Sequence, residues 1–383
     1  MIWASPPCRG PSRSRLSLNV GAPLSDCSRE SMPLAMPVPD LRQRGIALIT
    51  VLLVIALGTV IAVALLTRQQ YDIHRTRNIL ESDQASLLVR GIEDWAQELL
   101  EKDMKKGKTD HLEEDWASPL NPIEVENGLV EGQIRDLQAR FNLNNLYFPV
   151  KPSKTSPPPQ TDNRQGIQDP TVTSATGDLQ QAQKAKIYHP EKQFQRLLEV
   201  LGIDSDKIQI LTQSLQDWTD KDQDTHYPGG AEDAYYMDLT LPYRTGGIPL
   251  RLPGELLSIQ GYDQALLEKI SPYVTALPEI TAVNVNTAPK EVLMSLSERI
   301  DPNIASELIE NRGEKGYTNI QQFLQQKSLA GITIPPDAIT VSSQYFLVEG
   351  HSKFGNLQKR QYSVISRPNN KPARIILRGE GVY

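Results

Sequence analysis

The sequence predicts an α+β fold: a long N-terminal helix, an antiparallel sheet, and an all-α domain inserted into the sheet. Three observations lead to this prediction. Residues 46–66 form an uncharged apolar run that continues as an amphipathic helix, residues 339–377 alternate apolar and polar side chains, and a helical block lies between two strand-forming regions. The length of 383 residues allows two or three domains of modest size.

Composition excludes several classes of protein. The chain carries 40 Lys and Arg against 46 Asp and Glu, so it lacks the basic surplus that general nucleic-acid binding requires. Both cysteines, Cys8 and Cys27, lie in a Pro/Ser/Arg-rich stretch of 45 residues that we interpret as a leader. Without that stretch the net charge falls from −6 to −9 and no cysteine remains. Stability must then come from packing, from chain length and, where one binds, from a metal, because no disulfide can form.

The apolar run at residues 46–66 predicts one transmembrane helix. Its 21 residues carry no charge and would span roughly 31 Å, close to the hydrocarbon thickness of a bilayer. The run passes directly into a polar helix without a cleavage site, which indicates a retained anchor and not a secretory signal. Arg44 precedes the run and Arg68 follows it, so the positive charges leave its orientation undecided.

Beyond the membrane the helix becomes amphipathic and then gives way to strands and a loop. Apolar residues recur every three or four positions, at Leu88, Ile92, Trp95 and Leu99. The helix is expected to end between Lys102 and Thr109, and Leu129, Val130 and Ile134 suggest short strands. Residues 149–178 are rich in Pro, Ser, Thr and Asp and have too few large apolar residues to offset their ordering entropy, which predicts a disordered loop.

The second half of the chain changes from helical to strand periodicity. Helices are predicted at residues 194–201, 208–218, 264–274, 290–300 and 304–311. Residues 339–377 predict three antiparallel strands, with turns at Gly355-Asn356 and Asn369-Asn370. Because strands stand on both sides of the helical block, we expect that block to be an insertion.

Seven carboxylates crowd into residues 217–238, around the pair Gly229-Gly230. They are Asp217, Asp220, Asp222, Asp224, Glu232, Asp233 and Asp238. Such a cluster repels itself unless it is solvated or binds a cation, and Ca²⁺ prefers six to eight oxygen ligands. The segment is not an EF-hand, because the sixth position would be Thr225 and the twelfth Ala231. A calcium site and a solvated acidic loop both remain open at this point.

The junction between the leader and the apolar run resembles the cleavage site of type IV prepilins and type II secretion pseudopilins. The sequence reads Arg42-Gln43-Arg44-Gly45 and continues at once with IALIT. The resemblance implies that a prepilin peptidase cuts after Gly45 and methylates the new N-terminus at Ile46. It also implies a cytoplasmic leader, a single pass through the bacterial inner membrane, and a chain whose bulk lies in the periplasm.

One position departs from the pattern of that family. The fifth mature residue is Thr50, where most pilins have Glu. In a filament that buried carboxylate is thought to neutralise the N-terminal amine of the subunit ahead, because an unpaired charge in apolar surroundings costs several kcal/mol. A subunit at the tip has no neighbour ahead and can dispense with the Glu. Thr50 can also simply hydrogen-bond to the preceding helical turn, and both readings can hold together.

The chain from Gly45 onward resembles the K-type minor pseudopilins of the type II (general) secretion system. The resemblance rests on the residues that follow Arg44, on RTRNIL at 75–80, RFNLNNL at 140–146, PGGAEDAYY at 228–236 and VNVNTAP at 283–289. It implies a pilin-like helix and sheet, a SAM-like inserted domain with bound calcium, and a place at the tip of a periplasmic pseudopilus that supports export of folded proteins. The implied partners are the I-, J- and H-type minor pseudopilins, the major pseudopilin and the prepilin peptidase.

These inferences divide the chain into six segments. They are the leader at 1–45, the transmembrane part of the helix at 46–66, its continuation with the first strands at 67–148, a Pro-rich loop at 149–186, the inserted helical domain at 187–333, and C-terminal strands at 334–383.

Residues 256–261 and 305–317 resemble helix-hairpin-helix units, which can hold DNA phosphates on backbone N–H groups. The alternative function is therefore a membrane-anchored DNA-binding or DNA-uptake protein. However, Gly261 is followed by Tyr262-Asp263 and the domain is acidic, which favours structural packing and no nucleic-acid partner.

The remaining polar motifs predict structure and not catalysis. Asn284, Asn286 and Thr287 precede Pro289 in the pattern of a capped helix start, so we assign them a structural role. The five histidines are scattered without metal spacing, and no HExxH, GxSxG or P-loop sequence occurs. We predict no enzyme, no catalytic residues and no organic cofactor.

Overall fold

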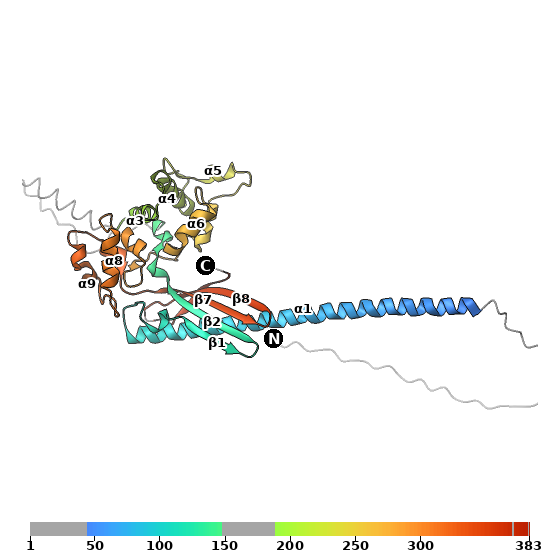
Figure 1. The fold of residues 1–383 in the computed structure, drawn as a ribbon. Coiled ribbons are helices and arrows are strands. Elements are labelled where there is room, and N and C mark those ends of the chain that lie inside the picture. Colours follow the sequence, from blue (N-terminus) through green and yellow to red (C-terminus); the bar gives the residue numbers. More distant parts are fainter. Residues whose placement is uncertain (1–43, 148–187, 370, 382) are drawn as a thin grey trace, which may run out of the picture. The chain divides into compact units, whose positions relative to one another are not determined.

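The computed structural model describes residues 44–147, 188–369, 371–381 and 383. The predicted Pro-rich loop at 149–186 lies outside the described residues. Of the predicted leader at 1–45, only residues 44 and 45 are described. The chain divides into two compact units, residues 1–71 and 72–383. Helix α1 (Arg44–Lys106) is a single helix of 63 residues, drawn in blue that passes to teal in Figure 1.

The first unit contains the apolar part of α1. Its large side chains are exposed from Ile46 to Leu66, and an 18-residue window there has a mean hydropathy of 3.0. By length and composition this helix can cross a membrane, as the uncharged run predicts. The Thr50 hydroxyl donates to the Ala47 carbonyl at 2.9 Å, which confirms the expected local hydrogen bond.

The second unit is built on a five-stranded antiparallel sheet in the order β1-β2-β7-β8-β9 (Figure 1). Its strands are β1 (Leu120–Val125), β2 (Gly128–Asp136), β7 (Tyr345–Phe354), β8 (Leu357–Ser366) and β9 (Arg374–Glu380). The chain leaves the sheet after β2 and returns to pair with it at β7. The three C-terminal strands and the turn at Gly355 match the alternating pattern of the sequence, and the α+β fold class is confirmed.

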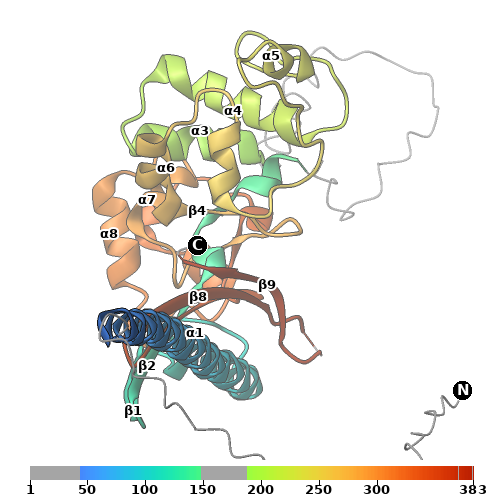
Figure 2. The same ribbon diagram turned by 90° about the vertical axis from the view of Figure 1, so that its right-hand side faces the viewer.

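The end of α1 within this unit packs on one face of the sheet, and the helical block packs on the other (Figure 2). The approach of α1 is close, because a Cβ on Gly132 would lie 2.6 Å from Ile92 Cγ2. The sequence predicted an apolar stripe at Leu88, Ile92, Trp95 and Leu99. Of these Ile92 is buried, and the other three are only partly buried. The fully buried residues are Ala85, Val89, Ile92, Ala96 and Leu100. Hydrophobic periodicity predicted the correct face of the helix. It did not single out Ala85 and Ala96, whose small side chains allow the helix to pack closely on the sheet.

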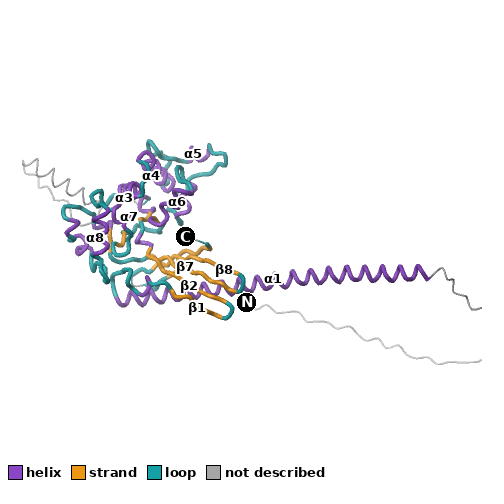
Figure 3. The backbone as a smooth tube through the Cα atoms, viewed as in Figure 1, coloured by secondary structure: helices purple, strands orange, loops and turns teal. Residues whose placement is uncertain are grey.

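The helical block consists of short helices joined by long loops (Figure 3). They are α3 (Pro190–Val200), α4 (Ser205–Thr219), α5 (Asp233–Met237), α6 (Gln264–Ile270), α7 (Lys290–Ser295), α8 (Pro302–Glu310) and α9 (Ile320–Leu324). The predictions at 264–274 and 290–300 were too long. The first gives way to a 3₁₀ turn at Ser271–Tyr273, which contains Pro272. Val274 then pairs with Phe141 in a two-residue ladder between β3 (Phe141–Asn142) and β4 (Val274–Thr275).

Asparagine side chains join the sheet to the helical block. Asn144 donates to the carbonyls of Leu250 and Leu277 at 2.8 Å and accepts from the Leu250 amide. Asn284 and Thr287 donate to Asp136 Oδ2 at 3.1 and 2.6 Å. The prediction that they begin a helix was wrong: the residue before α7 is Pro289, without a side-chain cap. Their structural role is instead to satisfy buried polar groups between two elements.

Glu93, which is buried on α1, forms an ion pair with Arg378 on β9, whose side chain is half exposed. Arg378 donates to its two oxygens from Nε and Nη2 at 2.8 and 2.7 Å, while Gln361 and Ser363 on β8 also donate. Burial raises the pKa of Glu93, but the hydrogen bonds from Arg378, Ser363 and Gln361 outweigh burial and hold the pKa below its ordinary value.

Substituting Arg378→Met is expected to lower the free energy of unfolding by about 1–3 kcal/mol, because hydrogen bonds to a buried charge are lost. The pair stabilises the fold above the ordinary glutamate pKa, and this contribution disappears as pH falls through the depressed pKa of Glu93. The difference between variant and parent in urea unfolding should therefore shrink in acid. Arg374→Met, an exposed position on the same strand, is the control. A constant difference down to pH 3 would contradict this assignment.

Candidate metal centre

The acidic loop is held between α4 and α5. The last turn of α4 buries Trp218, whose ring lies 5.1 Å from that of Tyr236 on α5 in an edge-to-face contact. Asp217, the preceding residue, is fully buried. Both ends of the loop are therefore fixed by the core of the helical block, and the carboxylates between them are placed on a rigid frame.

Two glycines allow the loop to fold back onto α4. A Cβ on Gly229 would lie 2.6 Å from Ile210 Cα, and a Cβ on Gly230 would lie 2.1 Å from Asp217 Oδ2. The Gln213 side chain bonds both sides of this turn, donating to the Tyr227 carbonyl at 3.1 Å and accepting from the Gly229 amide at 2.7 Å. Neither glycine position has room for a side chain.

Gly230→Ala is expected to displace Asp217 and lower the free energy of unfolding by about 1–3 kcal/mol, the usual cost of overpacking. Gly254→Ala is the matched control, because a Cβ there meets nothing within 4 Å. Thermal unfolding of both variants checks this. Equal melting temperatures would show that the loop is not braced against α4.

The structure brings four of the seven predicted carboxylates together. Ligand atoms of Asp220, Asp222 and Glu232 lie within 4.8 Å of one another, and those of Asp217, Asp220 and His226 do the same. His226 was not predicted as a ligand, because the five histidines do not show the mutual spacing of a metal site. Its place in the loop between the carboxylates and Gly229 was the available signal.

The other three predicted ligands do not join the cluster. Asp224 is exposed, and its amide donates to Asp222 Oδ1 at 3.0 Å. Asp233 accepts from the amide and hydroxyl of Thr245 at 2.9 and 3.0 Å. Asp238 is exposed at the end of α5. In the described part of the chain the cluster thus consists of four carboxylates and one imidazole.

The cluster carries negative charge that the described residues do not neutralise. Burial, and after it the charge of Asp217, raises the pKa of Glu232 to about 7. Burial and the charge of Asp222 raise the pKa of Asp220 to about 6. Both Glu232 oxygens and Asp220 Oδ1 are buried without a hydrogen-bond partner. Among described residues no Lys or Arg pairs with the four carboxylates, so the donor set fits a hard divalent cation such as Ca²⁺.

A second acidic group lies at the end of α1, and an arginine of the chain itself neutralises it. Asp103, Asp110 and Glu114 also lie within 4.8 Å of one another. Here Arg367 donates to Asp103 at 2.9 Å and also to Asp110, and its guanidinium lies 4.6 Å over the Phe346 ring. The chain supplies its own cation at this place, so the two acidic clusters are not equivalent.

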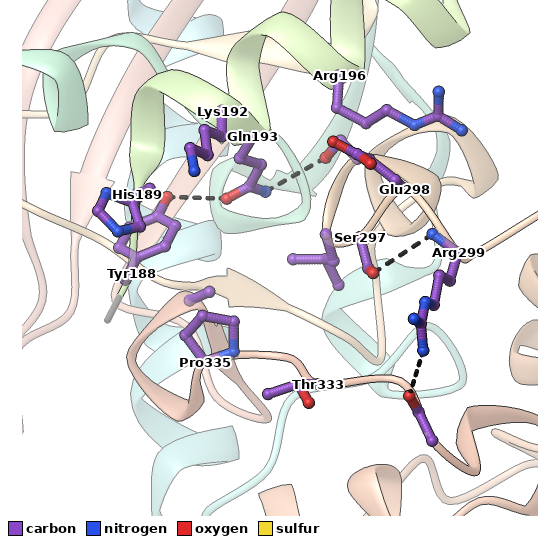
Figure 4. Close-up of a pocket in the computed structure, with 14 residues that line it drawn as sticks. Tyr188, His189, Lys192, Gln193, Arg196, Ser297, Glu298, Arg299, Thr333 and Pro335 are labelled. Carbon is purple, nitrogen blue, oxygen red and sulfur yellow. Dashed lines mark hydrogen bonds between the residues drawn. The ribbon is translucent and has the colours of Figure 1, made fainter. Parts of the chain in front are cut away.

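A cavity of about 840 Å³ opens between α3, the end of α7 and residues 331–338 (Figure 4). Its polar groups bind one another: Tyr188 donates to Gln193 at 2.8 Å, and Gln193 donates to Ser295 at 3.3 Å. Ser295 in turn donates to the Val292 carbonyl at 2.6 Å. The hydroxyls of Tyr188 and Ser295 are therefore committed to structural hydrogen bonds.

The hairpin-like segments are part of the core. Arg312 donates to the Ala288 carbonyl at 2.5 Å, and burial lowers its pKa to about 10. Tyr317 packs edge-to-face on Phe323, with ring centroids 5.2 Å apart. The basic residue that could have met a phosphate therefore bonds to the protein itself, which supports structural packing.

The segments of the chain that match known protein families coincide with the helical block. Two family models described as "Type II secretion system (T2SS), protein K" match residues 139–279 and 283–342, which together span the helical block between β2 and β7. The type II secretion system protein K of Pseudomonas aeruginosa is 31% identical over 346 residues, covering 88% of this chain and 93% of that protein. The chain belongs to the type II secretion system protein K family.

Other protein K relatives and a solved structure agree with this membership. The protein K of Aeromonas hydrophila is 31% identical over 89% of this chain and 98% of its own length. A chain in the crystal structure of the GspK-GspI-GspJ complex from enterotoxigenic Escherichia coli matches with a TM-score of 0.66 at 24% identity. That match covers 81% of this chain and 100% of the other. The likeness to this solved chain confirms the fold.

Proposed function

We propose that this protein K family member is a minor pseudopilin that caps the tip of the periplasmic pseudopilus and supports export of folded proteins. The observation that carries the proposal is Thr50 within the uncharged segment of α1. The segment from Ile46 to Leu66 contains no Asp or Glu, so it offers no carboxylate to the amine of a subunit ahead. The Thr50 hydroxyl donates instead to the Ala47 carbonyl of its own helix at 2.9 Å. An internal subunit without that carboxylate would leave a buried charge unpaired.

The proposal extends to processing, which rests on the leader junction at Gly45, and to location, which rests on the same helix. Cleavage after Gly45 by the prepilin peptidase frees Ile46, which is then methylated. The segment at 46–66 spans the inner membrane before assembly, and the second unit lies in the periplasm. The support is a helix with exposed large apolar side chains throughout this segment.

The partners proposed for this chain are the I-, J- and H-type minor pseudopilins and the major pseudopilin. The similar solved chain comes from a complex of GspK with GspI and GspJ. The apolar segment of α1 would pack against the equivalent helices of those proteins through van der Waals contacts. The alternative of a DNA receptor gains no support, because Arg312 is bound within the core.

The acidic loop would hold calcium through Asp217, Asp220, Asp222 and Glu232. Calcium would neutralise the cluster and satisfy the partnerless oxygens of Glu232 and Asp220. The proposed role of calcium is structural, and the protein is proposed to have no enzymatic activity.

The tip assignment is tested by labelling sheared pseudopili with an antibody against the helical block. We expect label at one end of each fibre only. Label along the shaft would overturn the proposal, since it would place this chain at internal positions without the carboxylate. Mass analysis of the purified protein tests processing separately, with an N-methylated Ile46 as the expected start.

A further inference from the structure

The cavity between α3, the end of α7 and residues 331–338 is basic, although the chain as a whole is acidic (Figure 4). Its lining contains the cations Lys192 and Arg196 on α3 and Arg299 after α7, against a single carboxylate, Glu298. Its volume of about 840 Å³ is within the range of ligand-binding sites. We propose that this cavity binds an acidic segment of a partner protein, in an extended conformation with carboxylates at alternate positions. Such binding depends neither on a position at the tip nor on the acidic loop.

The neutral polar groups of this cavity bind one another, whereas its cations keep free donors. Among the described residues, none forms a hydrogen bond or an ion pair with the ammonium of Lys192. Arg196 Nη1 donates to Glu199 at 3.0 Å, which uses one of five guanidinium donors, and its Nε is buried without a partner. Arg299 Nη1 donates to the Gly331 carbonyl at 2.9 Å, a group without formal charge. The cavity therefore presents positive charge to a ligand that enters it.

The spacing of Lys192 and Arg196 matches that of side chains on an extended peptide. Four residues of α-helix rise by about 6 Å, so these two cations lie on one face of α3, a turn apart. In an extended chain, side chains two residues apart share a face and are separated by roughly 6.5 Å. Two carboxylates at alternate positions of a peptide can therefore meet both cations of α3 at once. Arg299 belongs to another wall of the cavity and adds to the attraction.

Glu298 favours a peptide over a ligand that carries phosphate. No described residue pairs with its carboxylate, which lines the same cavity as the three cations. An ionised carboxylate only accepts hydrogen bonds. An extended peptide supplies backbone N–H donors as well as acidic side chains, so it can satisfy Glu298 and the cations together. A phosphate or a nucleic acid presents negative charge throughout, and Glu298 would repel it.

Fluorescence anisotropy with short labelled peptides and detergent-solubilised full-length protein tests this binding. One peptide alternates Glu with Ser, a second has the same composition with its Glu residues adjacent, and a third carries Gln in place of Glu. The protein variants are Lys192→Gln and Arg196→Gln, which remove the two charges on α3. Lys315→Gln is the matched control, because Lys315 is exposed, has no partner among the described residues and lies outside the cavity. Inorganic phosphate and a short single-stranded DNA serve as competitors.

We expect the alternating Glu peptide to bind saturably at low salt and the Gln peptide not to bind. Lys192→Gln and Arg196→Gln should each weaken binding roughly tenfold, as for the loss of a charge-assisted hydrogen bond, and Lys315→Gln should not change it. Arg196→Lys keeps the charge and should recover most of the affinity. Binding that is unchanged in both Gln variants of α3 would overturn the proposal. Equal affinity for adjacent and alternating Glu, or displacement of the peptide by phosphate or DNA at equal concentration, would also overturn it, because the cavity would then hold anions of any kind.

Discussion

Replacing Arg367 with methionine is expected to lower the free energy of unfolding by about 3–5 kcal/mol, the range for breaking a buried ion pair. Arg367 is almost completely buried and donates to Asp103, Asp110 and the Ser343 carbonyl. Burial already raises the pKa of Asp103, with a smaller contribution from the charge of Asp110. Without the guanidinium, two buried carboxylates would face each other with no cation.

Urea unfolding of the variant measures this loss. Arg360→Met, at an exposed position on β8, is the control and should change stability by less than about 0.5 kcal/mol. Adding Asp110→Asn to Arg367→Met should recover part of the loss, because it removes one of the two stranded charges. An Arg367→Met variant as stable as the parent would mean that water replaces the guanidinium at this place.

The same cluster shows why sequence could predict the elements but not their junctions. The length of α1 and the three C-terminal strands follow from local periodicity, which is present in short windows. Arg367 and Asp103 are 264 residues apart, and no local pattern connects them. The buried hydrogen bonds of Asn144 and Asn284 are long-range in the same way. The prediction that Asn284 helps to begin a helix was wrong for this reason.

The acidic loop was predictable only in part, because the sequence shows local spacing but not contacts between distant residues. The spacing of Asp217, Asp220 and Asp222 places them in one turn, which is a local property. Asp233 lies outside the cluster, and its carboxylate accepts hydrogen bonds from Thr245, 12 residues further on. His226 joins the cluster only because Gly229 and Gly230 allow the loop to return to α4.

Calcium is expected to raise the melting temperature of EDTA-treated protein by about 5–10 °C. A ligand at one hundred times its Kd stabilises by about 2.7 kcal/mol, and 1 kcal/mol shifts the melting temperature by about 2–4 °C for a domain of this size. Glu232→Gln should remove most of the shift, because it takes away the buried carboxylate that has no other partner. Asp238→Asn, at an exposed carboxylate outside the cluster, is the control. An unchanged melting temperature with calcium would refute the site.

The calcium effect should also depend on pH in a defined direction. Burial raises the pKa of Glu232 to about 7 in the cation-free protein, so folding favours its protonated form. Stability of the EDTA-treated protein should therefore fall as pH rises from the ordinary glutamate pKa to about 7. Calcium opposes this loss, because it replaces the proton as the partner of the carboxylate. The calcium-induced shift should thus be largest near pH 8 and decline below pH 7, and a shift independent of pH would assign binding to the exposed carboxylates instead.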